Sequence, residues 1–248
     1  MKPFLIITLI AAAFSGAARA AILVQDSFPS NGSLVGTTPA VGGVWQYLSG
    51  TADSLLVAGN RLQIQDNSTE DAASAFSSVT SLDGYAGFTL NMSSLDLPSP
   101  GGDYFASFRS ASSYVGQIFA LAPTGTAAGK FRLGVKNNLS GTTSVWASDL
   151  DPGTDYRVVV KFTQSGSNDF VTLWVSPSSE ASTSVSTTAA AISTDLAGFA
   201  FRQTAATGDL AIADLVVGQS FSEVVPEPQT WALVALGVAA VIRRTRRR

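Results

Sequence analysis

The sequence predicts an all-β fold, built as one antiparallel β-sandwich, and three observations support this prediction. Short runs rich in β-branched and aromatic residues alternate between apolar and polar side chains with a period of two, as half-buried strands do. Turn sequences such as Asp151-Pro152-Gly153 recur at intervals of roughly ten residues, a spacing typical of sandwiches. Between the two ends of the chain, no stretch has a sustained helical period and no linker divides the sequence.

Four runs give the clearest strand predictions, because their apolar side chains alternate or are nearly continuous over the whole run. A Ser/Thr-rich stretch at 178–188 is expected to form a surface loop or a polar edge segment, and one turn of helix is expected near 193–196. In chain order, the predicted strands are residues 61–65 (RLQIQ), 131–136 (FRLGVK), 156–162 (YRVVVKF) and 170–175 (FVTLWV).

Three stretches resemble parts of the concanavalin A-like, LamG-type jelly rolls. They are the opening VQDSF at 24–28, the strand–turn–strand unit at 150–177 and the late stretch GDLAIADLVVG at 208–218. The resemblance spans most of residues 21–222 and implies a single jelly-roll β-sandwich domain over that range. Such domains begin with a strand that pairs near the closing one, so 24–28 is expected close to 208–218. The resemblance implies a fold, with no activity attached.

The first twenty residues have the three parts of a secretory signal peptide. Lys2 gives the positive start, residues 4–14 are an apolar run, and Ala18-Arg19-Ala20 is an A-x-A cleavage site. The apolar run is too short for a comfortable membrane span. We therefore expect a signal helix over 1–20 that is removed, so that the exported chain begins near Ala21.

The other end carries a proline motif, a short apolar run at 231–242 and a basic tail at 243–248. Twelve helical residues extend about 18 Å, against about 30 Å of bilayer hydrocarbon, so a transient or processed transmembrane helix is favoured over a permanent anchor. Basic residues resist translocation and hold their side of the segment in the cytoplasm. The motif is Pro226, Glu227 and Pro228, and the basic residues are Arg243, Arg244, Arg246, Arg247 and Arg248.

This tail resembles the PEP-CTERM sorting domain of bacterial surface proteins, in which a Pro-Glu-Pro motif precedes a short transmembrane stretch and an arginine-rich end. The resemblance covers about residues 224–248, and we assign 223–248 to the sorting signal. It implies an exosortase-type enzyme as a partner and a transient stay in the inner membrane. The cell surface or extracellular matrix is then the expected destination. The alternative is an ordinary C-terminal membrane anchor.

The composition excludes several classes of function. The chain has no histidine and no cysteine, so neither a Ser-His-Asp nor a Cys-His nucleophile can form, and the usual zinc sites are excluded. Lys2, Arg19 and the five C-terminal arginines account for seven of the 15 basic residues. Without them, eight basic groups face 18 acidic groups, a net charge of about −10. Nucleic acid is therefore not expected as a partner, because it requires basic surface.

The acidic residues offer no predicted catalytic site but one candidate calcium site. Retaining glycosidases need two carboxylates about 5–5.5 Å apart, and none of the four glutamates stands in the Glu-x-Asp-x-Glu pattern. Asp149, Asp151 and Asp155 are interpreted as turn residues rather than calcium ligands. The denser group is the calcium candidate, with turn chemistry as its alternative. Its members are Asp66, Asn67, Glu70 and Asp71.

Two aromatic residues are the candidate glycan contacts. Trp45 and Tyr104 stand close to the glycine pairs Gly42-Gly43 and Gly101-Gly102, so loops could bring them to a groove. The alternative at each position is core packing, which sandwiches also need.

Taken together, these features predict an exported, non-catalytic protein with a structural or adhesive role in the envelope or extracellular matrix. One alternative is a lectin-like module that binds exopolysaccharide. A weaker alternative is a divergent glycan hydrolase or lyase.

Overall fold

The computed structural model describes residues 21–79, 83–123, 128–138, 141–165, 168–190 and 195–225. The predicted signal peptide, the Pro-Glu-Pro motif, the apolar run at 231–242 and the arginine tail lie outside these ranges. Residues 193 and 194 of the helical turn expected near 193–196 lie outside them as well, and Leu196 is the first residue of a strand. Within the described ranges, no helix is both long enough and apolar enough to cross a membrane.

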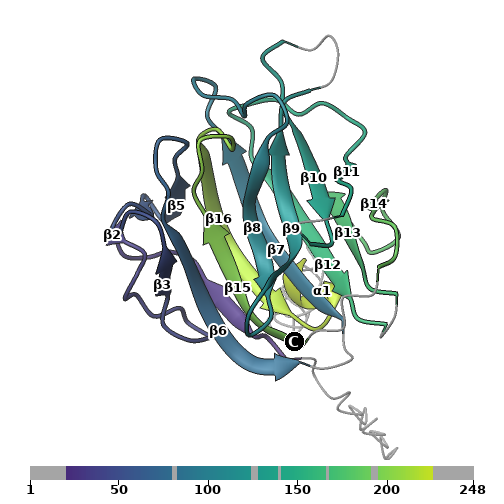
Figure 1. The fold of residues 1–248 in the computed structure, drawn as a ribbon, viewed down its shortest axis with the longest axis horizontal. Helices are drawn as coiled ribbons and strands as arrows, with labels where there is room; N and C mark the ends of the chain where they lie inside the picture. Colours follow the sequence, from purple (N-terminus) through teal and green to yellow (C-terminus); the bar gives the residue numbers. More distant parts are fainter. Residues whose placement is uncertain are drawn as a thin grey trace, which may run out of the picture.

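The described residues form two antiparallel sheets (Figure 1). The nine-stranded sheet has the order β14-β13-β12-β7-β16-β5-β4-β2, and β1 also pairs with β16. Its strands are β1 (Val24–Asp26), β2 (Gly32–Ser33), β4 (Leu56–Ala58), β5 (Arg61–Ile64), β7 (Gly84–Met92), β12 (Tyr156–Thr163), β13 (Phe170–Val175), β14 (Val185–Ser186) and β16 (Leu210–Gly218).

The seven-stranded sheet has the order β11-β10-β9-β8-β15-β6-β3. The chain changes sheet at each step from β5 to β8 and again from β14 to β16, so both sheets combine early and late segments. These crossings and the antiparallel pairing confirm the predicted jelly-roll sandwich. The strands of this sheet are β3 (Gln46–Ser49), β6 (Asp71–Val79), β8 (Asp103–Arg109), β9 (Tyr114–Leu121), β10 (Arg132–Lys136), β11 (Ser144–Val145) and β15 (Leu196–Arg202).

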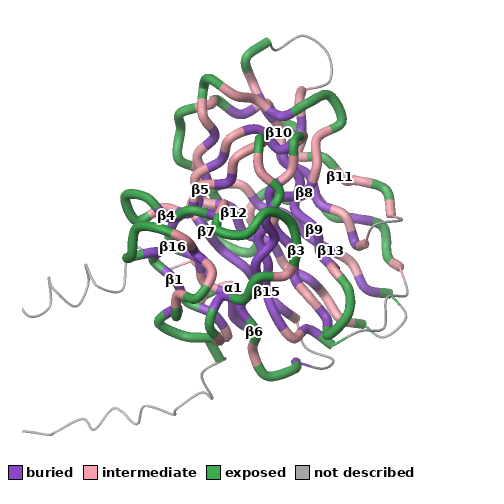
Figure 2. The backbone as a smooth tube through the Cα atoms, turned by 60° about the vertical axis from the view of Figure 1, so that its left-hand side comes forward, coloured by how far each residue is buried: buried purple, intermediate pink, exposed green. Residues whose placement is uncertain are grey.

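One apolar core fills the space between the sheets. Strand alternation explains its composition, since every second side chain of a strand points to the same face. In β12, Val158, Val160 and Phe162 are fully buried in this core, and in β10 Leu133 and Val135 are. Figure 2 shows buried backbone along the central strands and exposed backbone mainly in the connections. A chain without cysteine therefore obtains its stability from apolar burial.

All four predicted strands exist, as β5, β10, β12 and β13, with ends that differ by one residue at most from the prediction. The expected closure is confirmed as well, because Val24 pairs with Val217 and Asp26 with Leu215. The polar stretch at 178–188 contains the edge strand β14, which pairs with β13. The sequence did not identify β6, β7, β8, β9 and β15, which are all interior strands of the two sheets.

A short helix, α1 (Phe221–Val224), closes the described chain and packs on the outer face of the nine-stranded sheet. The Phe221 ring meets Trp174 edge-on at a centroid distance of 5.7 Å, and Val224 is fully buried. The Glu223 carboxylate accepts hydrogen bonds from the backbone N–H groups of Gln219 and Ser220. The folded part thus continues to Val225, three residues beyond the domain limit assigned from sequence.

Candidate functional site

The outer face of the seven-stranded sheet has a floor of small side chains. In β15, Phe199 and Phe201 point into the core, so Gly198 and Ala200 face outward. Gly198 pairs with Ala75 and Ala200 with Ala73 in β6, and these alanines share the outer face. These four small residues form a floor without bulky side chains of its own, in which Ala73, Gly198 and Ala200 are buried and Ala75 is exposed.

Two β-bulges in the neighbouring β8–β9 pair place polar side chains beside this floor. Gly116 adopts a positive φ of 59°, and a Cβ there would meet the core rings of Phe108 and Phe162. Gly116 and Ile118 therefore face the core, and Gln117 between them faces outward. Ser107 faces outward too, because it pairs with Ala200 of β15.

Several polar atoms on this face are buried without a hydrogen-bond partner. They are the Ser107 hydroxyl, both amide atoms of Gln117, Arg109 Nε and Asp71 Oδ1, five of the eight such atoms found in the described ranges. Gln117 is 0% exposed and Ser107 1%. Buried polar groups are nearly always hydrogen-bonded, and an unsatisfied one costs about 1–3 kcal/mol. Five of these eight atoms therefore gather on one face, which makes this face the candidate site for hydrogen bonds with solvent or a ligand.

Three aromatic side chains stand next to these groups. The Tyr104 ring lies 6.0 Å from the Tyr114 ring and 5.9 Å from the Phe119 ring, measured between centroids. The guanidinium of Arg202 lies over Tyr104 at 4.3 Å from its centroid. Burial raises the pKa of Tyr104 to about 12 and also raises the pKa of Tyr114. Both phenols are therefore neutral near pH 7 and can donate a hydrogen bond.

An acidic pair shares one arginine at the end of this face. Arg202 Nη1 lies 3.1 Å from Asp103 Oδ2, and its Nε lies 3.8 Å from Asp71 Oδ1. Ser49 donates a hydrogen bond to the other carboxylate oxygen of Asp71 at 2.9 Å. Burial nevertheless raises the pKa of Asp71 above its ordinary value, against the lowering effects of Ser49 and Arg202.

A groove of about 310 Å³ runs along the small-residue floor. Ala73, Ala75 and Gly198 line its base, while Gln46 and Leu48 of β3 and Arg109 of β8 are among the residues beside it. The groove therefore connects the floor to the end of β8 that carries Arg109.

The interpretation of Trp45 as a glycan contact is wrong for this structure, because Trp45 belongs to the core. Its side chain is 1% exposed, its ring lies 5.5 Å from Phe201, and its Nε1 donates a 2.7 Å hydrogen bond to Asp26. Tyr104 does lie on the outer face, although its ring is covered by neighbours and 6% exposed. Contact between Tyr104 and a glycan stays a prediction.

The four residues predicted to bind calcium do not converge. Glu70 is fully buried, and its carboxylate accepts hydrogen bonds from the backbone N–H groups of Asp53 and Ser54 at 3.1 and 2.7 Å, and from that of Leu55. Asp71 points to the outer face beside Arg202. Adjacent strand residues face opposite sides, so Glu70 and Asp71 cannot share an ion. Asn67 accepts a hydrogen bond from Ser68.

Asp66 instead approaches Asp96 and Asp209, which sequence reasoning did not single out. One carboxylate oxygen from each lies within 4.8 Å of the others, and all three side chains are half-buried. Desolvation, followed by repulsion from the two neighbours, raises the pKa of Asp66. Carboxylates in such a group could hold a divalent cation such as calcium.

The remaining acidic turn residues each pair with a cation. Asp149 bonds to Arg132 and Asp151 to Lys130, whereas Asp155 accepts two hydrogen bonds from Arg61 and one from Asn91. These contacts lower the pKa of Asp155. Each of these carboxylates is paired with a different cation, which agrees with their interpretation as turn residues rather than calcium ligands.

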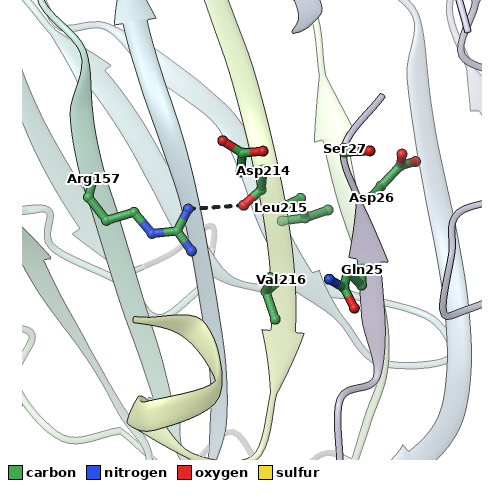
Figure 3. A pocket seen from close by; sticks show the side chains of 7 residues that line it. All are labelled: Gln25, Asp26, Ser27, Arg157, Asp214, Leu215 and Val216. Carbon is green, nitrogen blue, oxygen red and sulfur yellow. Dashed lines mark hydrogen bonds between the residues drawn. The ribbon is translucent and has the colours of Figure 1, made fainter. Parts of the chain in front are cut away.

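A second hollow, of about 410 Å³, lies on the nine-stranded sheet (Figure 3). Arg157 reaches across to β16 and donates a 2.9 Å hydrogen bond to the carbonyl of Asp214, and a second bond to the carbonyl of Val224. Its guanidinium is thus committed to fixing β16 and α1, and burial lowers its pKa. We interpret this hollow as structural. It is lined by Gln25, Asp26, Ser27, Arg157, Asp214, Leu215 and Val216.

Comparison with known proteins identifies the tail. The PEP-CTERM protein-sorting motif matches residues 224–248. The chain ends in a PEP-CTERM sorting signal. Such a signal marks a protein for export and sorting, and the match covers a tenth of the sequence, so it says nothing about the task of the sandwich. No curated protein matches the chain.

Solved structures with a similar fold include carbohydrate-binding domains and an enzyme. The exoplasmic/lumenal domain of VIP36, bound to Ca²⁺ and Man2, is 12% identical, with 84% of this chain and 91% of that chain covered and a TM-score of 0.44. The Emp47p carbohydrate recognition domain is 11% identical, with coverages of 79% and 97% and a TM-score of 0.41. An alginate lyase from Pseudomonas aeruginosa is 11% identical, with coverages of 72% and 83% and a TM-score of 0.43. At these similarities, function has to be inferred from the residues of this chain.

Proposed function

We propose that the exported PEP-CTERM sandwich binds polysaccharide on the outer face of its seven-stranded sheet. The observation that carries this proposal is the set of buried, unpartnered polar atoms of Ser107 and Gln117 beside the rings of Tyr104 and Tyr114. Sugar hydroxyls both donate and accept, so they can satisfy an amide and a hydroxyl at once when the side chains that close these atoms to solvent move aside. Ligand sites combine such placed polar groups with apolar and aromatic surface. The groove on the same face is lined by Arg109, which pairs with Tyr114 across strands β8 and β9.

We further propose that this binding serves a structural or adhesive role, without catalysis. Glycan hydrolysis needs one carboxyl group that is protonated and acts as the acid, and a second that is ionised. The environments of the two groups therefore have to differ. On this face, Arg202 adjoins the carboxylates of Asp71 and Asp103, and burial nevertheless raises the pKa of Asp71. The proposal of a non-catalytic role therefore rests on the sequence, which has no histidine, no cysteine and no Glu-x-Asp-x-Glu pattern. A processed, cell-surface location and an exosortase-type partner complete the proposal.

The test is retention of the protein by polysaccharides in affinity electrophoresis, with the full chain kept in a mild detergent. Tyr114→Ala removes a half-buried ring from the outer face and should weaken retention about ten-fold, as loss of an aromatic anchor does. Tyr47→Ala is the matched control, because this tyrosine is 46% exposed on the edge strand β3 and should leave retention unchanged.

Two results would contradict the proposal. Equal retention of the wild type and Tyr114→Ala would place any binding elsewhere. Release of reducing ends or unsaturated sugars from a retained polysaccharide would replace the non-catalytic role with the hydrolase or lyase alternative.

A further inference from the structure

The basic residues of the folded domain are distributed unevenly. Residues 21–225 contain 17 of the 18 acidic residues, all but Glu227, and eight basic ones. Half of the basic residues stand on strands of the seven-stranded sheet, and the register places them on its outer face. These four are Arg109 on β8, Arg132 and Lys136 on β10, and Arg202 on β15.

Two of these four cations have no carboxylate partner. Five of the eight cations in the domain form ion pairs, and Arg157 is bonded to backbone carbonyls. Arg109 and Lys136 alone among them make neither kind of contact within the described residues. Each instead lies against a ring of this face, Arg109 at 5.3 Å from the centroid of Tyr114 and Lys136 at 5.8 Å from that of Phe119.

The lack of partners is informative because carboxylates outnumber cations about two to one in this domain. Lys136 pairs in register with Gln117, whose amide has no partner, and Arg109 has a buried, unpartnered Nε at the groove. Lys136 therefore lies beside the Gln117 amide, and Arg109 lies beside Tyr114 and the groove on the same face. A ligand that supplied negative charge here would satisfy both kinds of group together.

We propose that the polysaccharide bound on this face is anionic, carrying carboxylate or sulfate groups that pair with Arg109 and Lys136. This inference rests on the proposed polysaccharide-binding function and adds the chemical class of the ligand. The net charge of the domain is negative, so a polyanion gains nothing from the overall field and has to be held by local contacts.

The experiment compares charged and neutral forms of the same backbone, with the full chain in detergent. Polygalacturonate is tested against its fully methyl-esterified form for the carboxylate, and dextran sulfate against dextran for the sulfate. We expect retention of a charged form at least about ten-fold tighter than of its neutral partner, and weaker retention as NaCl rises.

Single substitutions test whether Arg109 and Lys136 cause the preference for charged polysaccharides. Arg109→Gln and Lys136→Gln should each reduce binding of the charged form about five- to ten-fold, while Arg109→Lys should keep most of it. Arg61→Gln makes the same change of charge on the nine-stranded sheet, where Arg61 pairs with Asp155, and should have little effect.

The outcomes separate the two proposals. Equal retention of charged and neutral forms, lost in Tyr114→Ala, would overturn the anionic inference and leave the polysaccharide-binding face intact. Charge preference that Arg61→Gln reduces as much as Arg109→Gln would also overturn it. No retention of any polysaccharide would overturn both.

Discussion

At the scale of single residues, the structure distinguishes satisfied from unsatisfied buried polar groups. Asp26 is 4% exposed, and both of its carboxylate oxygens are used, one by the backbone N–H of Phe28 and one by Trp45. Gln117 is more deeply buried and has no partner for either amide atom. The first arrangement stabilises the fold, whereas the second costs free energy unless a ligand or solvent completes it.

This contrast predicts an opposite effect of one substitution on stability and on binding. Gln117→Met keeps the length of the side chain and removes the unsatisfied amide, so the free energy of unfolding should rise by about 1 kcal/mol. Polysaccharide retention should fall, because the hydrogen-bonding groups are gone. Urea unfolding and affinity electrophoresis on the same preparation measure the two effects. A variant that loses stability and keeps full retention would contradict the role given to Gln117.

The three-carboxylate group predicts how stability depends on pH. The pKa of Asp66 is raised in the folded state, so the folded protein holds this proton more tightly than the unfolded chain. Stability from this group should therefore fall as pH rises from about 3.8 through the raised value. Asp96→Asn removes one of the repelling charges and should add about 0.5 kcal/mol at pH 7, and nothing at pH 3.

Urea unfolding at pH 3 and pH 7 tests this, with Asp195→Asn as the control because Asp195 stands outside the group. Calcium, if it binds here, should raise the melting temperature of the wild type more than that of Asp96→Asn. A gain that is equal at both pH values would show that repulsion is not the cause.

At the scale of elements, alternation predicted the regular strands and missed the irregular ones. β12 has three apolar core residues in strict alternation, so it was recognised from sequence. β8 and β9 pair through two bulges, and the period of two is broken at Phe105–Ala106 and at Val115–Gly116, where neighbouring residues both face the core. β6 begins Asp-Ala-Ala-Ser-Ala, and such small residues give no hydropathic contrast. The average alternation of apolar and polar residues is sufficient to predict a sandwich. The positions of the bulges depend on tertiary packing, which this local pattern does not record.

The candidate site was missed for the same reason, because it lies on those strands. Tyr104 was predicted to contact a glycan because of its glycine neighbours. That argument led to a residue on the outer face of the seven-stranded sheet but did not identify the polar groups beside it. Trp45 was selected by the same argument, and its bond to Asp26 joins segments 19 residues apart that no local pattern relates. A polar Gln117 inside the apolar run 115–121 was the one available signal.

The docked helix α1 predicts that the end of the domain contributes to stability. Val224 is fully buried against the group formed with Tyr85, Val159 and Trp174. Val224→Ala should lower the free energy of unfolding by about 1–2 kcal/mol, from lost apolar burial and a small cavity. Ser222→Ala, at an exposed position of the same turn, should change it by less than about 0.5 kcal/mol. Equal effects of the two variants in urea unfolding would mean that α1 is not packed as described.

At the scale of the whole molecule, the sorting signal matched at residues 224–248 begins where the described sandwich ends. The sandwich folds around one core and closes on itself, since β1 pairs with the last strand, β16. α1 then fixes the point at which the chain leaves the domain, next to Arg157.

This boundary leads to a prediction about the exported protein. Mass spectrometry of the surface-associated form should find a chain that starts near Ala21 and lacks Arg243–Arg248, because both signals act before the domain reaches its destination. Loss of these ends takes the net charge from −3 to about −10, which isoelectric focusing detects independently. Replacing Pro226 and Pro228 with alanine should let the intact tail accumulate in the membrane fraction, while the domain unfolds at an unchanged urea concentration. An arginine tail retained on the wild-type surface protein would establish simple anchoring in place of processing.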